Sequence, residues 1–496
     1  MWVFHSKDIV MKKIMIFGLF MAMSGILTAQ NEVDALRYSQ VYYQGTARSM
    51  AMGGAFGALG ADFSALSTNP AGMGLYRSSE FTFTPEISTG KTFSSYNGMT
   101  GEDSRTNLAI SNLGFVFTNP VPEGSTNTPW KYYQFAFGMN RSNSFNNRAF
   151  VRGDNPDHSL VDVYLDEVWN VNPQDIESNF PFDIYPAWYV YVLDTIRDVN
   201  GDLIYTSPVP QGGIRQQELF KSWGSTSEWL FSGSANMNDR LFFGATLGLP
   251  YVRYFEETRY SEIDIADTIP FFDNWNYSET LETRGWGINL KLGIIAWPVD
   301  WLRVGAAFHT PTYYYGLKDI WYTSTDAQLG PDYNRKDSPT GEYEYELSTP
   351  LKAIGSVALI IGKYGSLSAD YEFVDYSNMK LRALDYNFTD ENDAINALYG
   401  STSNLRFGTE WRYSNFSFRG GYAIYGSPYA QGENDEYQTY SFGIGYSERD
   451  FSLDLAYVHG ERSRDYYLYS SANYTTNAAR QTYTSDHFAL TARFRF

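Results

Sequence analysis

The chain ends in the sequence DHFALTARFRF, which covers residues 486–496. Apolar side chains occupy every second position from Phe488 to Phe496, and the positions between them carry small, polar or charged groups. Successive side chains of a β-strand point to opposite faces, so this segment predicts a strand with one apolar and one polar face. A soluble protein could bury such a face against a core, so the meaning of the pattern depends on how often it recurs.

The same alternation recurs along most of the chain, most clearly at 228–237, 286–294, 405–412 and 440–447. Many strands of roughly ten residues, apolar on one side and polar on the other, are typical of a transmembrane β-barrel. Extending the rule predicts an all-β, antiparallel barrel of about fourteen strands. They are expected near 79–87, 106–117, 131–139, 228–238, 241–249, 284–296, 301–309, 350–361, 365–375, 404–412, 415–425, 438–447, 451–459 and 486–496.

The lengths of the connections support this count. Tight turns are expected near 238–240, 297–300, 362–365, 413–415 and 448–450, and they alternate with long connections at 140–227, 250–283, 310–349, 376–403, 427–437 and 460–485. Bacterial barrels have short periplasmic turns and longer extracellular loops, so the long connections are predicted to be extracellular.

The longest connection is expected to have structure of its own. Asn200-Gly201 predicts a type I′ hairpin between 189–192 and 203–205. Asp198, Asn200 and Asp202 leave a calcium loop as an alternative, although the glycine and glutamate that follow in an EF-hand are missing.

Composition agrees with a barrel and excludes other classes. Aromatic residues make up 18% of the chain, which suits the two interfacial girdles of a barrel. The formal net charge of −19 argues against nucleic acid as a partner and fits acidic extracellular loops. The chain has no cysteine, so neither a disulfide nor a cysteine metal site can form.

The N-terminal region predicts a secreted protein. Lys12 and Lys13 precede an apolar run from Ile14 to Leu27, and Thr28-Ala29 offers a cleavage point. We therefore expect residues 1–29 to be a signal peptide, with the natural start at Met11. A membrane anchor is the alternative, but the run is short for a spanning helix. The expected location is the outer membrane of a Gram-negative bacterium.

Residues 30–78 do not have the pattern of barrel strands. Residues 50–60 are small and glycine-rich, and Asn69-Pro70-Ala71-Gly72 predicts a turn. The segment could be a compact lead-in to the first strand or a plug inside the barrel formed by 79–496.

Residues 48–55, Asp62 and Asn69-Pro70-Ala71-Gly72 resemble the N-terminal hatch of the FadL family of long-chain fatty acid transporters. The resemblance implies a fourteen-stranded barrel with a small hatch. It also implies passive uptake of hydrophobic molecules, which are captured in an outer groove, enter an apolar pocket in the lumen and leave through a gap in the wall. It does not place the cationic residues that hold a fatty acid carboxylate.

Two functions follow from the resemblance. The first is a plugged outer-membrane channel for hydrophobic molecules such as long-chain fatty acids. The alternative is a non-transporting shuttle or scaffold of a protein secretion system, which would bring a secretion-system partner. Expected partners are a hydrophobic small molecule, outer-membrane lipid and lipopolysaccharide. The terminal Phe496 resembles the signal read by the barrel-assembly machinery. No cofactor is expected.

An enzyme is not expected. His158, His309, His459 and His487 lack metal-ligand spacing, and the chain has no Gly-x-Ser-x-Gly motif. We therefore predict neither catalytic residues nor a metal site.

Candidate ligand-binding residues are cations on predicted lumen faces and aromatic residues in the longest loop. Lys291, Arg303 and Arg406 could hold a carboxylate, but ion pairs with acids such as Glu372, Glu410 and Asp454 are the alternative. Trp188 and Tyr189 could capture an apolar ligand outside the barrel. Their alternative role is packing within the loop.

Overall fold

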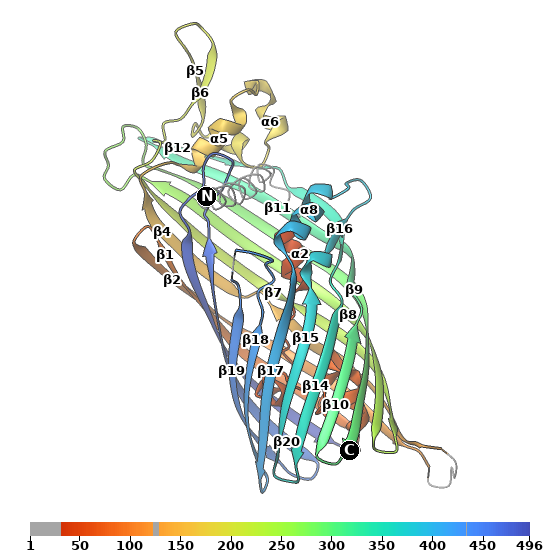
Figure 1. The fold of residues 1–496 in the computed structure, drawn as a ribbon. Helices are drawn as coiled ribbons and strands as arrows, with labels where there is room; N and C mark the ends of the chain where they lie inside the picture. The colour runs from red at the N-terminus through yellow and green to blue at the C-terminus, as the bar shows by residue number, and fades with distance from the viewer. Residues whose placement is uncertain (1–30, 123–127, 433) are drawn as a thin grey trace, which may run out of the picture.

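A computed structural model of the chain describes residues 31–122, 128–432 and 434–496. Fourteen antiparallel strands form one closed barrel, as predicted (Figure 1). The ring closes where the first strand pairs with the last, for example Phe83 with Ala492. The barrel strands are β1 Glu80–Tyr96, β2 Met99–Pro120, β3 Trp130–Ser144, β7 Ile214–Met237, β8 Leu241–Ile263, β9 Asn274–Val299, β10 Leu302–His309, β14 Lys352–Ile361, β15 Gly365–Asp375, β17 Ser401–Tyr413, β18 Phe416–Tyr425, β19 Tyr437–Ser447, β20 Phe451–Tyr466 and β21 Ala479–Arg495.

The predicted signal peptide, residues 1–29, lies outside the described residues. Within the part of the chain that the structure describes, no helix has the length and apolar character needed to cross a membrane.

A belt of apolar side chains surrounds the barrel. On β9, Leu290 is 39% exposed, whereas its neighbours Asn289 and Lys291 are only 8% and 5% exposed. The same alternation holds along β14, where every second residue from Ala353 to Leu359 faces outward. The five tight turns also fall where they were expected, between the strands that end and begin at those residues. The predicted register therefore puts the apolar face of each strand on the outside of the barrel.

The strands extend much further than the sequence prediction. β7, β8 and β9 are 24, 23 and 26 residues long, so most of 250–283, expected as a loop, belongs to the sheet. Likewise, 310–349 is mostly strand, because β11 continues the barrel beside β9 and pairs with two further strands. Beyond the apolar belt both faces of a strand meet water or polar groups, so the alternation that reveals a strand disappears there.

Short elements extend one end of the barrel. The additional strands are β4 Asn147–Asn155, β5 Asp194–Arg197, β6 Leu203–Thr206, β11 Tyr313–Leu329, β12 Asp332–Asp337, β13 Gly341–Ser348 and β16 Lys380–Arg382. The helices at this end are α5 Leu160–Val168, η3 Pro173–Asp175, α6 Ile176–Asn179, α7 Ile184–Tyr189, η4 Tyr376–Asn378 and α8 Thr389–Leu398. The C-terminus lies at the opposite end (Figure 1).

Two Asn-Gly pairs form hairpin turns of different kinds. Asn97 and Gly98, between β1 and β2, have φ of 46° and 77°, as a type I′ turn requires. The sequence analysis did not predict this turn. It therefore expected the first strand to end at 87 and the second to begin at 106, whereas β1 ends at Tyr96 and β2 begins at Met99. Asn200-Gly201 does lie in a hairpin, between β5 and β6. However, Tyr189 ends a helix, and the Asp198 carboxylate accepts hydrogen bonds from the backbone of Asn200 and Asp202. No metal-binding group of acidic or histidine side chains is found among the described residues.

Residues 156–213 form a small cap over the end of the barrel opposite the C-terminus (Figure 1). The cap has its own apolar core, in which Val168, Ile176 and Ile184 pack against Trp275 of β9. The buried Glu262 carboxylate of β8 joins cap and barrel, because it accepts hydrogen bonds from Ser159 at 2.5 Å and from the Trp275 indole at 2.8 Å. The middle of the predicted loop 140–227 is therefore a folded unit, and both ends of that loop belong instead to β3, β4 and β7.

The N-terminal segment runs through the inside of the barrel. It contains α2 Glu32–Ser39, α3 Ala47–Met50, α4 Ala65–Thr68 and η2 Pro70–Leu75. Residues 45–76 are buried except for Ala61, whereas α2 lies higher in the barrel, beside α8 (Figure 1).

Candidate functional site

The N-terminal segment is hydrogen-bonded to strands around much of the barrel. The Ala47 amide donates to Thr491 on β21 at 2.7 Å, and the Gly57 amide donates to Asp370 on β15 at 3.0 Å. On the other side, the Asn140 amide of β3 donates to Ser67 at 2.9 Å. Each bond joins groups that are remote in sequence, so the segment is fixed in the lumen by the barrel wall.

The glycine-rich run 50–60 fits against small residues on the lumen face of the wall. A methyl group on Gly421 of β18 would lie 2.2 Å from the Gly53 amide nitrogen. Gly53 itself has φ of +61°, a conformation that glycine adopts without strain. The close approach of two backbones explains why both positions carry glycine.

The Asn69-Pro70-Ala71-Gly72 turn is anchored by the Asn69 side chain, which is fully buried. Its Nδ2 donates to the carbonyl oxygens of Gly57 at 2.7 Å and of Ile294 on β9 at 3.2 Å. Its Oδ1 accepts from the Ala71 amide at 3.1 Å. Asn69 therefore joins two parts of the N-terminal segment and the barrel wall through one side chain.

A network of buried charges runs along the lumen side of the wall beside this segment. Arg48 donates to Glu410 of β17 at 2.8 Å, and Glu410 also accepts from Arg419 of β18 at 2.7 Å. Arg419 and Arg493 both bind Asp454 of β20, each at 2.6 Å. Each carboxylate lies between two guanidinium groups, so these charges are bound to one another and are not directed toward an empty space.

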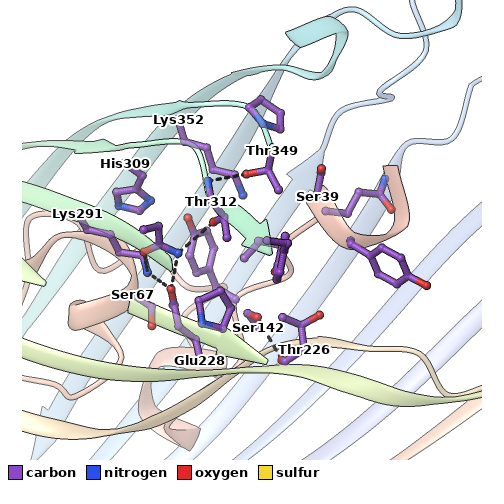
Figure 2. A pocket seen from close by; sticks show the side chains of 18 of the residues that line it. Ser39, Ser67, Ser142, Thr226, Glu228, Lys291, His309, Thr312, Thr349 and Lys352 are labelled. Carbon is purple, nitrogen blue, oxygen red and sulfur yellow. Dashed lines mark hydrogen bonds and ion pairs between the residues drawn. The ribbon is translucent and has the colours of Figure 1, made fainter. Parts of the chain in front are cut away.

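An inner pocket of about 50 Å³ lies between this segment and the strands (Figure 2). Lys291 forms an ion pair with Glu228 there, and Asn289 donates to the same carboxylate at 2.8 Å. Lys352 and Arg141 also line the pocket. Its volume has room for only one or two water molecules, so a larger ligand would require side chains to move.

Lys352 differs from the other cations of the lumen. It is 7% exposed, and among the described residues no carboxylate lies within ion-pairing distance of its ammonium group. The inner pocket therefore has three cationic side chains, Arg141, Lys291 and Lys352, and one carboxylate, Glu228.

A larger outer pocket of about 340 Å³ lies on the side of the cap. Its lining is rich in tyrosine and also includes Leu36 and Phe145; the tyrosines are Tyr42, Tyr254, Tyr429, Tyr437, Tyr466 and Tyr483. Gln40 and Gln44 line both pockets, so the chain that follows α2 separates them. Aromatic rings with hydroxyl groups suit ligands that combine an apolar body with a polar group.

The barrel wall is interrupted beside these pockets. One edge of β2 pairs with β1, and the other edge pairs with β3 only from Asn112 to Pro120. Among the described residues, no strand pairs with this second edge at positions 99–111. A hollow of about 310 Å³ opens there between β2 and β7. It shares Arg141 with the inner pocket and Asn146 with the outer one. The hollow in the side of the barrel therefore adjoins both pockets, with Arg141 and Asn146 at the boundaries.

The predicted ligand-binding residues have different surroundings. Lys291 lines the inner pocket, whereas Arg303 donates to the Leu59 carbonyl at 2.7 Å. Arg406 is fully buried, and its guanidinium binds Glu372 at 3.0 Å and stacks on Tyr43. Arg303 and Arg406 thus lie outside the lining of the pockets.

The two aromatic candidates lie in the cap, outside the pockets. The Trp188 ring packs 5.7 Å from that of Tyr205, and Tyr189 is 51% exposed beside Lys336. Sequence reasoning did not single out Arg141, Glu228 or Lys352. The register of β14 alone could have placed Lys352 in the lumen.

Comparison with known proteins supports the fold. No family model matches the sequence, and no curated protein matches it either. Solved structures do match. A FadL homologue of Pseudomonas aeruginosa is 13% identical, with a TM-score of 0.57 over 92% of this chain and 100% of that one. The toluene transporter TodX of P. putida is 12% identical, with a TM-score of 0.55 over 92% and 99%. The chain therefore has the fold of the FadL-type barrels.

Proposed function

We propose that the protein is an outer-membrane channel for the passive uptake of hydrophobic molecules. The observation that supports this best is the set of three adjoining spaces above the buried N-terminal segment. The outer pocket would take up the ligand, the inner pocket would hold its polar end once the side chains there move apart, and the hollow in the wall would release it sideways into the membrane. The solved structures with this fold include a transporter named for toluene, a hydrophobic compound.

The inner pocket favours a ligand with an acidic group, such as a long-chain fatty acid. A buried ammonium group is costly unless an anion accompanies it. Lys352 has no carboxylate within ion-pairing distance among the described residues. Glu372 on the next strand is bound to Arg406, and the single acid of the pocket, Glu228, is bound to Lys291. A ligand carboxylate beside Lys352 would supply the missing negative charge, which a hydrocarbon could not do.

Uptake of labelled oleate and labelled toluene tests this proposal in a host that lacks its own channels of this kind. We expect saturable oleate uptake by the intact protein. Lys352→Ala should weaken oleate binding by roughly ten- to a hundredfold, since hydrogen bonds to charged groups contribute about 1.5–3 kcal/mol. Lys380→Ala is the control, because Lys380 is an exposed lysine of β16 outside the pockets.

The outcomes separate the claims. If Lys352→Ala lowers the uptake of oleate and toluene equally, the channel remains but the acidic-ligand claim is wrong. If neither compound is taken up and the purified protein forms a stable complex with secretion components, the scaffold function replaces the channel.

A further inference from the structure

Three arginines and a stacked pair of aromatic rings lie at the edge of the wall hollow, and we call this group of five side chains the rim. The Trp223 ring of β7 stacks on the Phe255 ring of β8 at 5.3 Å, with only 9° between the planes. Arg105 of β2 lies 5.0 Å from the centre of the Trp223 ring. Arg253 and Arg284 lie 4.8 and 5.7 Å from the centre of the Phe255 ring. Three guanidinium groups therefore flank one stacked aromatic pair.

The charges of this rim are not balanced. Arg253 and Arg284 lie directly opposite each other on β8 and β9, an arrangement that repulsion disfavours. Arg284 forms an ion pair with Glu282, but neither Arg253 nor Arg105 has a carboxylate within ion-pairing distance among the described residues. Of the described residues that line the hollow, none is acidic, and Arg141 adds a further cation.

The rim lies at a defined height on the barrel. On the outward face of β8 and β9, the Tyr251 and Trp286 rings pack 4.7 Å apart at the edge of the apolar belt. Arg253 and Arg284 follow two residues beyond this pair, on the side of the cap, which is roughly 7 Å further along the strands. Tyrosine and tryptophan mark the boundary between lipid tails and head groups, so the arginines lie at head-group level. Below them, Leu108 is 73% exposed and faces the hydrocarbon.

We propose that this rim binds the net-negative, phosphate-bearing head group of an outer-leaflet lipid. Guanidinium groups bind phosphate oxygens in pairs of hydrogen bonds, and arginines above an apolar surface suit a head group whose tails lie below it. The lipid phosphate would offset the repulsion between Arg253 and Arg284 and supply the anion that Arg105 lacks. The site borders the proposed exit of the ligand, but binding of a lipid head group there does not depend on what the channel carries.

The test is binding of bis-phosphorylated lipid A to the full-length protein in an uncharged detergent, measured by native mass spectrometry. Phosphatidylcholine serves as the lipid without net charge. We expect tight lipid A binding by the unaltered protein. Combined Arg105→Ala and Arg253→Ala should weaken it by at least about tenfold, because two charge-assisted contacts are lost. Arg253→Lys should weaken it less, since it keeps the charge but not the paired geometry.

Arg259→Ala is the matched control, because Arg259 is an exposed arginine further along β8 that does not line the hollow. Each variant is first checked for the folded barrel by its heat-dependent gel mobility. If the double variant folds and binds lipid A as tightly as the control, the proposal is wrong. Complete competition by inorganic phosphate would make the rim a site for free phosphate, and equal binding of phosphatidylcholine would leave no role for the arginines. Either result overturns the lipid head-group proposal.

Discussion

The Asn69 side chain offers the sharpest test of how the N-terminal segment is held in the barrel. Asn69→Ala removes the hydrogen bonds to Gly57, Ile294 and Ala71, all within the protein interior. A hydrogen bond contributes about 1 kcal/mol net. The bonds to Gly57 and Ala71 hold the segment's own fold, and the bond to Ile294 holds the segment to the wall. Loss of the Ile294 bond alone would raise the undocked fraction about fivefold, since 1.4 kcal/mol corresponds to tenfold.

The readouts are single-channel conductance in planar bilayers and sensitivity of cells to antibiotics that the outer membrane excludes. We expect Asn69→Ala to show brief openings to small hydrophilic solutes, and deletion of 30–68 to give a permanently open pore in a barrel that still assembles. Arg77→Ala is the control, because its ion pair with Asp239 is about half exposed and worth little. A folded deletion variant that stays as tight as the unaltered protein would refute the view that this segment closes the lumen.

Three further predictions concern facing, topology and pH. Leu290→Arg should destabilise the barrel by about 2–4 kcal/mol in a folding titration, and Leu290→Phe should not; equal effects would contradict the outward facing of Leu290. A tag at 198–202 should be labelled on intact cells and a tag at 448–450 should not, and the reverse would invert the topology. Burial, and then Asp183 and Asp166, raise the pKa of Glu167 in the cap to about 7. Glu167 therefore destabilises the cap increasingly as the pH rises from its unfolded pKa of about 4.3 toward 7. Glu167→Gln should slow hydrogen exchange of α5 at pH 8 and have no effect at pH 4; an equal effect at both would exclude titration as the cause.

The barrel could be predicted because the membrane imposes a simple rule on its strands. Wherever one face meets lipid and the other meets the lumen, side chains alternate, as from Trp286 to Ile294. The short turns were equally predictable, because polar turn residues interrupt that alternation at 238–240 and 448–450. Where the strands leave the apolar belt this rule ends. The outer half of β8 and the strand β11 were therefore predicted as loops, although the ladder of backbone hydrogen bonds continues through them.

The site was less predictable because its geometry depends on pairings between distant residues. Sequence reasoning could place Lys291 and Arg406 on lumen faces. It could not show that Glu228, sixty-three residues from Lys291, would bind one of them. The ion pair between Arg48 and Glu410 spans 362 residues. Lys352 remains without an ion-pairing carboxylate because Glu372 on the next strand binds Arg406 instead, and this can be known only from the fold.

The way in which the lumen is closed bears on the direction of passage. Releasing the N-terminal segment would break its bonds to Thr491, Glu410, Asp370 and Asn140, together with the bond from Asn69 to Ile294. At about 1 kcal/mol for each, these five bonds alone make full release cost about 5 kcal/mol, so it would occur in fewer than about one molecule in 10³. Passage through the side of the barrel breaks none of them, because β2 already lacks a partner strand above Asn112. If the protein carries hydrophobic molecules, the sideways route is therefore favoured: it keeps the lumen closed to water while the ligand enters the lipid.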